Sequence, residues 1–270
     1  MPKWNYEKDI NYNNIDVSKV KNNEFLLFIV SISSFIEITS ETYANNLIEY
    51  YKDNEEATNW LKNSWEIEEI QHGKALKRYV NTVWPEFDWE KAYNRFLELY
   101  LPLCNLEALQ PSKGLEMVAR MIVETGTSTF YKTLERYSNS LNEPVLANIA
   151  HYIHKDEVNH YSYFNKFYKY YNEKEKISRK DILKVIINRL KDMNDEDIKL
   201  AYQAVYETLY NKKYDPKSYD LFHKEINKMA NKYYPYNMAI KMMLNPLRIN
   251  SIIEASMVPV IRTAMKVLGV

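Results

Sequence analysis

One short pattern occurs twice in the chain and limits the folds that this sequence can adopt. Each copy is an acidic residue followed by Glu-x-x-His, at Glu68–His72 and at Asp156–His160. A spacing of three residues places the glutamate and the histidine one turn apart on the same face of an α-helix. We therefore expect two helices that each offer an oxygen and a nitrogen to one metal ion.

A further glutamate precedes each copy of the pattern at a matching distance. Glu37 lies 32 residues before Glu69, and Glu124 lies 33 residues before Glu157. A polar turn lies about midway in each pair, so each pair should meet at one height of an antiparallel helical hairpin. Carboxylate and imidazole ligands suit iron or manganese, and bridging carboxylates suit a dinuclear site. The expected metal ligands are Glu37, Glu69, His72, Glu124, Glu157 and His160.

A simpler explanation of each motif is a solvent-exposed helix face. Charged residues are rarely buried, so a single Glu-x-x-His is weak evidence for a metal. Here the motif is duplicated, and apolar residues share the face of the ligands, such as Trp65 near Glu69 and Met121 near Glu124. A carboxylate on an apolar face is costly unless a partner or a metal compensates, which favours the metal site.

Helical periodicity runs through the chain, and Gly, with 4 residues, is scarce. We expect one all-α domain over residues 1–270. It would comprise a ferritin-like four-helix bundle with a crossover helix over residues 24–172, and a packed helical extension over residues 173–270. The long helices are expected at residues 24–52, 55–79, 89–101, 113–137 and 143–171. Shorter helices are expected to begin near Ser178, Asn194, Pro216, Pro235 and Asn250.

Two further side chains are candidates near the ligands. Glu41 lies one turn after Glu37, but its separation from Glu69 is only 28 residues, so Glu37 is the preferred ligand. Thr127 lies three residues after Glu124 on the same face. Its hydroxyl could bond an oxygen species on the metal, as a catalytic residue, or it could bond the backbone of its own helix.

Each motif glutamate is directly preceded by another acid, Glu68 or Asp156. A metal-bound histidine usually donates its other ring N–H to a carboxylate or a carbonyl. We expect Asp156 to support His72 in this way and Glu68 to support His160. The alternative is that both acids are exposed charges.

Composition restricts the possible partners and the compartment. Lys and Arg together number 36, as do Asp and Glu, so no strong net field attracts nucleic acid or an anionic membrane. Cys104 is the single cysteine, which excludes an intrachain disulfide and agrees with a cytoplasmic location. No signal peptide is evident. The most apolar run, residues 25–38, is shorter than a membrane span and contains Glu37, so we expect a buried helix.

At the motif residues the sequence resembles the soluble diiron acyl-carrier-protein desaturases, within the ferritin-like diiron oxygenase superfamily. The segment Trp65–Gly73 is similar to the family's Trp-x-x-Glu-Glu-x-x-His-Gly signature. The resemblance extends over roughly residues 25–167. The other matching stretches are Phe35-Ile36-Glu37 with Thr42-Tyr43, Glu124-x-x-Thr127, and Asp156-Glu157-x-x-His160.

The resemblance implies two iron ions, O2 as co-substrate, and hydrogen abstraction from an unactivated carbon of a fatty acyl chain on acyl carrier protein. It also implies a ferredoxin-like electron donor and a homodimer. Glu37 and Glu157 would be terminal carboxylates, and Thr127 would lie near the oxygen-binding side. The remaining ligands would be the bridging Glu69 and Glu124, and His72 and His160, one to each iron.

The chain also departs from that family. It is much shorter than the plant-type enzymes, and Thr125-Gly126 replaces the more usual Arg-Ala after the glutamate. Other functions therefore stay open: a diiron hydroxylase or N-oxygenase of a small metabolite, a non-catalytic iron-binding or ferroxidase protein, and a metal-free helical interaction module. The ligand set suits a mixed Mn/Fe pair as well as two irons.

Overall fold

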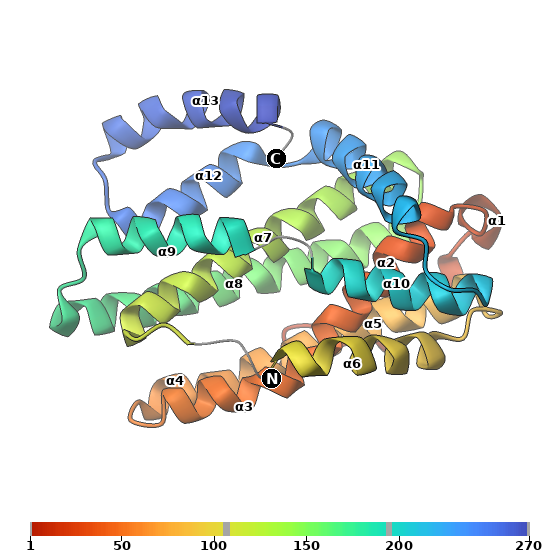
Figure 1. Ribbon diagram of the computed structural model, residues 1–270, viewed down its shortest axis with the longest axis horizontal. Helices are drawn as coiled ribbons and strands as arrows, with labels where there is room; N and C mark the ends of the chain where they lie inside the picture. The colour runs from red at the N-terminus through yellow and green to blue at the C-terminus, as the bar shows by residue number, and fades with distance from the viewer. Residues whose placement is uncertain (1, 105–108, 193–195, 269–270) are drawn as a thin grey trace. The chain divides into compact units, whose positions relative to one another are not determined.

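The computed structural model describes residues 2–104, 109–192 and 196–268, and every regular element among them is a helix (Figure 1). The expected all-α helical bundle fold is therefore confirmed. The chain forms two compact units, and each draws on the expected bundle and on the expected extension. Unit 1 comprises Met1–Glu107, Ser138–Ile149 and Asp195–Glu225, and unit 2 comprises Ala108–Tyr137, Ala150–Asn194 and Ile226–Val270.

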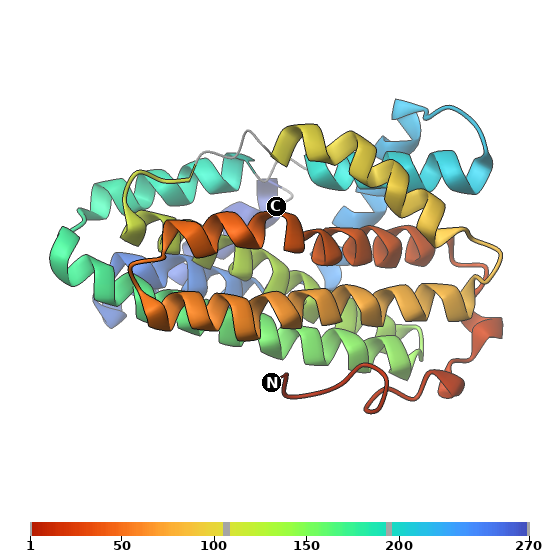
Figure 2. The same cartoon turned by 90° about the horizontal axis from the view of Figure 1, so that it is seen from below.

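Unit 1 is built on a helical hairpin whose two arms are antiparallel (Figure 2). The first arm comprises α2 (Glu24–Thr39) and α3 (Glu41–Tyr50). The second arm comprises α4 (Glu55–Trp60), the π-helical turn η2 (Leu61–Trp65) and α5 (Glu66–Val83). The remaining elements of the unit are η1 (Tyr12–Asn14), α1 (Val17–Val20), α6 (Trp89–Cys104), α10 (Glu196–Tyr210) and the first part of α11 (Pro216–Tyr233).

Both arms of this hairpin depart from the continuous α-helices expected over residues 24–52 and 55–79. The first arm is interrupted at Ser40, whose N–H and hydroxyl both donate to the Glu37 carbonyl, at 3.2 and 2.7 Å. Such side-chain bonds to the helix backbone compete with the regular ladder. The second arm contains the π-helical turn η2 directly before the ligand-bearing helix α5, and π turns are frequent at functional sites.

The apolar helix α2 is covered inside unit 1, as expected for residues 25–38. The Phe28 ring stacks on Tyr202 of α10, with ring centroids 4.6 Å apart. The stretch Glu24–Tyr50 is long and apolar enough to cross a membrane by composition, but 72% of its most apolar window is buried within the protein. Core helices of globular proteins combine the same two properties.

The segment before α2 packs on α5, which its polar composition did not predict. Trp4 is 5% exposed and lies beside His72. The Tyr12 hydroxyl donates to the Ala75 carbonyl at 3.2 Å, and the Trp84 indole N–H donates to the carbonyl of Lys21 at 2.8 Å. The segment therefore runs in the same direction as α5 and covers one side of it.

Unit 2 contains most of α7 (Lys113–Ser140) and α8 (Pro144–Glu175). Two hydroxyls of α8 bond the C-terminal helices: Tyr161 donates to the Met242 carbonyl at 2.7 Å, and Tyr168 donates to the Pro246 carbonyl at 3.0 Å. The C-terminal helices of unit 2 are α9 (Arg179–Asp192), α12 (Tyr236–Leu244), η3 (Asn245–Leu247) and α13 (Ser251–Leu268).

The five shorter helices begin within two residues of their expected starts, at Arg179, Glu196, Pro216, Tyr236 and Ser251. Pro residues at or just before a helix start, and polar caps, made these starts predictable. Asn194 and the side chain of Cys104 lie outside the described residues, although Cys104 itself ends α6.

Candidate metal centre

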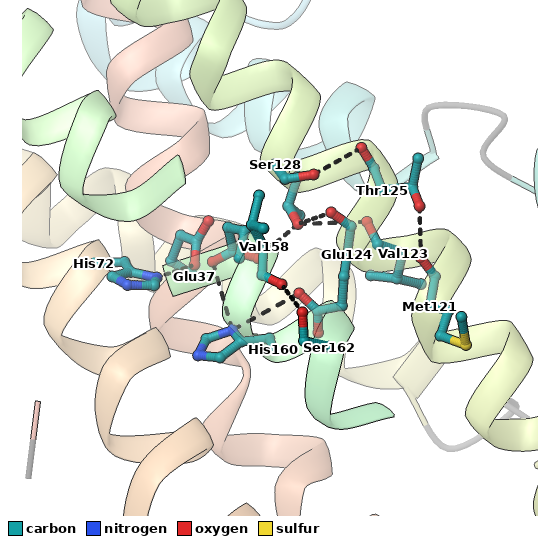
Figure 3. Close-up of polar contacts among 12 residues, drawn as sticks. Glu37, His72, Met121, Val123, Glu124, Thr125, Ser128, Val158, His160 and Ser162 are labelled. Carbon is teal, nitrogen blue, oxygen red and sulfur yellow. Dashed lines mark hydrogen bonds and ion pairs between the residues drawn. The ribbon is translucent and has the colours of Figure 1, made fainter. Parts of the chain in front are cut away.

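Unit 1 contains a triad of possible metal ligands from two helices. Glu37 comes from α2, and Glu69 and His72 come from α5. One ligand atom of each residue lies within 4.8 Å of the others, and all three residues are at least 93% buried. The Nδ1 atom of His72 is 3.5 Å from Oε2 of Glu37 (Figure 3). We call this group the unit 1 triad.

Unit 2 contains a second triad of the same composition. Glu124 comes from α7, and Glu157 and His160 come from α8. Their ligand atoms also lie within 4.8 Å of one another, and all three residues are buried. The Nδ1 atom of His160 is 3.8 Å from Oε2 of Glu124 and 3.8 Å from Oε1 of Glu157 (Figure 3). This group is the unit 2 triad.

Burial changes the acid–base properties of the unit 2 triad. Desolvation raises the pKa of Glu124 to about 8, and the neighbouring Glu157 charge raises it further, while His160 opposes the shift. Glu124 therefore holds a proton at neutral pH unless a cation neutralises its charge. The proton and a metal ion compete for the same carboxylate.

The donor sets of both triads fit a metal ion. Each triad offers two carboxylates and one imidazole, a combination that suits iron, manganese or zinc rather than copper(I) or calcium. Buried carboxylates are costly unless a proton, a partner or a metal compensates their charge. Each triad could therefore hold one metal ion, and the buried Glu/His clusters bear out the coarser part of the expected metal site.

Thr127 makes a contact that the sequence did not indicate. Its hydroxyl donates to Oε2 of Glu157 at 2.6 Å. The contacts with its own helix, to the carbonyls of Val123 and Glu124, are longer, at 3.4 and 3.3 Å. The hydroxyl therefore fixes one oxygen of a candidate ligand, so that Glu157 has its other oxygen directed elsewhere.

The remaining acids separate clearly by exposure. Glu41 is exposed on the surface, which agrees with the preference for Glu37. Glu68 and Asp156 are 4% and 2% exposed, so the alternative that they are exposed charges is wrong. Their expected pairing with the two histidines joins residues of different units and stays a prediction.

Sequence reasoning missed two neighbours of His72. The Trp4 ring stacks on the His72 ring, with centroids 6.2 Å apart and planes 12° apart; an isolated Trp in a polar segment gives no periodic signal. Gly73 follows His72 inside α5, where it packs against α2. A glycine within a helical pattern does signal a packing reason, and this signal was available.

A polar cleft lies elsewhere in unit 1. It has a volume of about 870 Å³ and is lined by α6, α10 and the residues that follow α10. Arg95 and Glu207 form an ion pair in it, with Nε and Oε2 2.8 Å apart. Its lining is charged, so this cleft does not suit an acyl chain.

The chain matches no protein-family model, no curated protein and no solved structure. The assignment of a metal site therefore depends on the two triads themselves.

Proposed function

We propose that the two triads together hold two iron ions and that the protein is an O2-dependent diiron oxidoreductase. The observation that carries this proposal is the presence of one buried Glu-Glu-His triad in each unit. The equal spacing of Glu37 and Glu124 from their motifs supports a paired arrangement. Ferritin-like bundles that hold two metals use a Glu from each of two helices and Glu-x-x-His from each of the others.

The individual residues have distinct roles in this proposal. Glu37 and Glu157 would each bind one ion, and Glu69 and Glu124 would bridge the two ions. Two bound iron ions would supply the electrons that activate O2. Thr127 holds one oxygen of Glu157, which limits the ways in which that carboxylate can bind. The histidines, His72 and His160, would each complete the ligand set of one ion.

For the substrate, we propose a fatty acyl chain on acyl carrier protein, desaturated with electrons from a ferredoxin-like donor by a homodimeric enzyme. The signature-like segment Trp65–Gly73 supports this choice. Hydroxylation or N-oxygenation of a small metabolite is the alternative, because the triads define the metal and not the substrate. Incubation of the iron-loaded protein and a reductant with an acyl carrier substrate, and separately with amines, separates the two by product analysis.

The first test is the metal content of protein loaded anaerobically with Fe2+, followed optically on addition of O2. We expect about two irons per chain and a transient visible band. Replacement of both His72 and His160 by Ala should abolish loading, and Glu41→Gln, at an exposed acid of α3, is the matched control. Protein that binds no iron, or that keeps its iron in the double variant, would contradict the proposal.

A non-catalytic iron-storage role is tested separately. Particle size in solution distinguishes a large closed shell from a small oligomer, and O2 consumption with turnover of an organic substrate distinguishes oxidation from storage. A closed shell without turnover would replace the proposed activity by storage.

A further inference from the structure

Helices α2 and α5 make a close contact beside the unit 1 triad. Gly73 follows His72 directly, and a Cβ atom at this position would lie 2.8 Å from the Ile38 nitrogen and 2.9 Å from the Ser34 carbonyl oxygen. It would also meet the Ile38 side chain. Two of these neighbours are backbone atoms of α2, so any larger residue must push the two helices apart.

A hydrogen bond crosses the same contact. The Ser34 hydroxyl donates to the Gly73 carbonyl at 2.8 Å, and both residues are buried. Ser34 lies three residues, or about one turn, before Glu37. The contact therefore lies one turn from one ligand and one residue from the other, where Nδ1 of His72 is 3.5 Å from Oε2 of Glu37.

We propose that Gly73 and Ser34 are positioning residues that set the separation of Glu37 and His72, so that the unit 1 triad is preorganised for its metal ion. The inference rests on the proposed metal function. Ligand distances in a metal site tolerate changes of only about 0.2 Å. A displacement of α2 from α5 by the width of a methyl group exceeds that tolerance.

The test is a titration of metal-free Gly73→Ala with Co2+, followed by its visible absorption. The wild type should bind two Co2+ ions per chain. In Gly73→Ala one of the two should bind at least about tenfold more weakly, as for other residues that orient ligands. The second ion, held by the unit 2 triad, should bind as in the wild type. Circular dichroism establishes that the variant is folded.

Gly114→Ala is the matched control. Gly114 is also a buried helical glycine, but a Cβ there would meet side-chain atoms of Ile177, Glu175 and Tyr171 in unit 2. It should lower stability and leave both Co2+ affinities unchanged. A merely structural role for Gly73 would make the two variants behave alike.

Ser34→Ala keeps the inference testable if Gly73→Ala does not fold. Loss of the hydroxyl should weaken one Co2+ ion and leave the other unchanged, whereas Ser33→Ala should alter neither, because Ser33 bonds only its own helix at Ile29. Unchanged binding of both ions in folded Gly73→Ala or in Ser34→Ala would overturn the inference. A wild type that binds no Co2+ would instead refute the proposed function, and the inference with it.

Discussion

At the scale of single residues, Thr127 shows how one hydroxyl restrains a candidate ligand. Its bond to Oε2 of Glu157 is short, at 2.6 Å, and hydrogen bonds to charged groups contribute about 1.5–3 kcal/mol. Thr127→Val removes the donor at nearly constant volume. We expect a loss of about 1–3 kcal/mol in the free energy of unfolding, measured by urea denaturation. Thr127→Ser keeps the hydroxyl and should retain most of that stability. Equal losses in both variants would contradict a role for the bond.

Glu124 gives a second residue-scale prediction, through pH. Its pKa is raised from the ordinary value of 4.5 to about 8 by burial and by Glu157. Between these two values the folded chain binds more protons than the unfolded chain. The metal-free protein should therefore be most stable below pH 4.5 in this contribution, and should lose it as the pH rises through 8.

The comparison of wild type with Glu124→Gln isolates this contribution, because Gln stays neutral. Urea denaturation across the pH range should show a wild-type free energy of unfolding that falls relative to the variant as the pH increases. Metal binding should also release a proton near pH 7, measurable by calorimetry in buffers of different ionisation enthalpy. A constant difference between the two proteins would contradict the assignment.

The same residues show what a sequence can predict at this scale. The six candidate ligands were identifiable because a helical spacing of three and a repeated separation of 32 or 33 residues define shared faces. The stacking of Trp4 on His72 and the bond from Thr127 to Glu157 depend on tertiary contacts. No local spacing in the sequence encodes those contacts.

At the scale of elements, long helices were predictable and short ones were not. Periodicity needs several turns, so it identified α7 and α8 but not η1 or α1, which have three and four residues. The interruption at Ser40 and the π turn η2 were also missed, because both keep the apolar face of the helix nearly in phase.

The segment before α2 carries the prediction at this scale. Trp4 anchors it on α5 beside His72, and large-to-small changes of buried aromatic residues cost about 3–5 kcal/mol. Trp4→Ala should lower the free energy of unfolding and should increase hydrogen exchange in α5 more than in α6. Lys3→Ala, at the exposed neighbour, is the control. Unaltered exchange in α5 would mean that the segment does not stabilise this helix.

At the scale of the whole molecule, each compact unit contains one triad. The proposed centre requires ions that both units share, through the bridging carboxylates Glu69 and Glu124. Two independent mononuclear sites would satisfy the same triads. The two possibilities differ in how metal stabilises each unit, because ligands stabilise only the part of the folded chain that binds them.

Hydrogen exchange of anaerobically Fe2+-loaded protein distinguishes these possibilities, with α5 reporting on unit 1 and α9 on unit 2. Glu37→Gln, at a proposed terminal ligand, should reduce metal-induced protection in α5 and largely preserve it in α9. Glu69→Gln, at a proposed bridging ligand of the same unit, should reduce protection in both helices. Because both substitutions replace a buried carboxylate of unit 1 by its amide, they are matched in size and charge. Full protection of α9 in Glu69→Gln would mean that the triads bind metal independently, and a shared diiron centre would then be excluded.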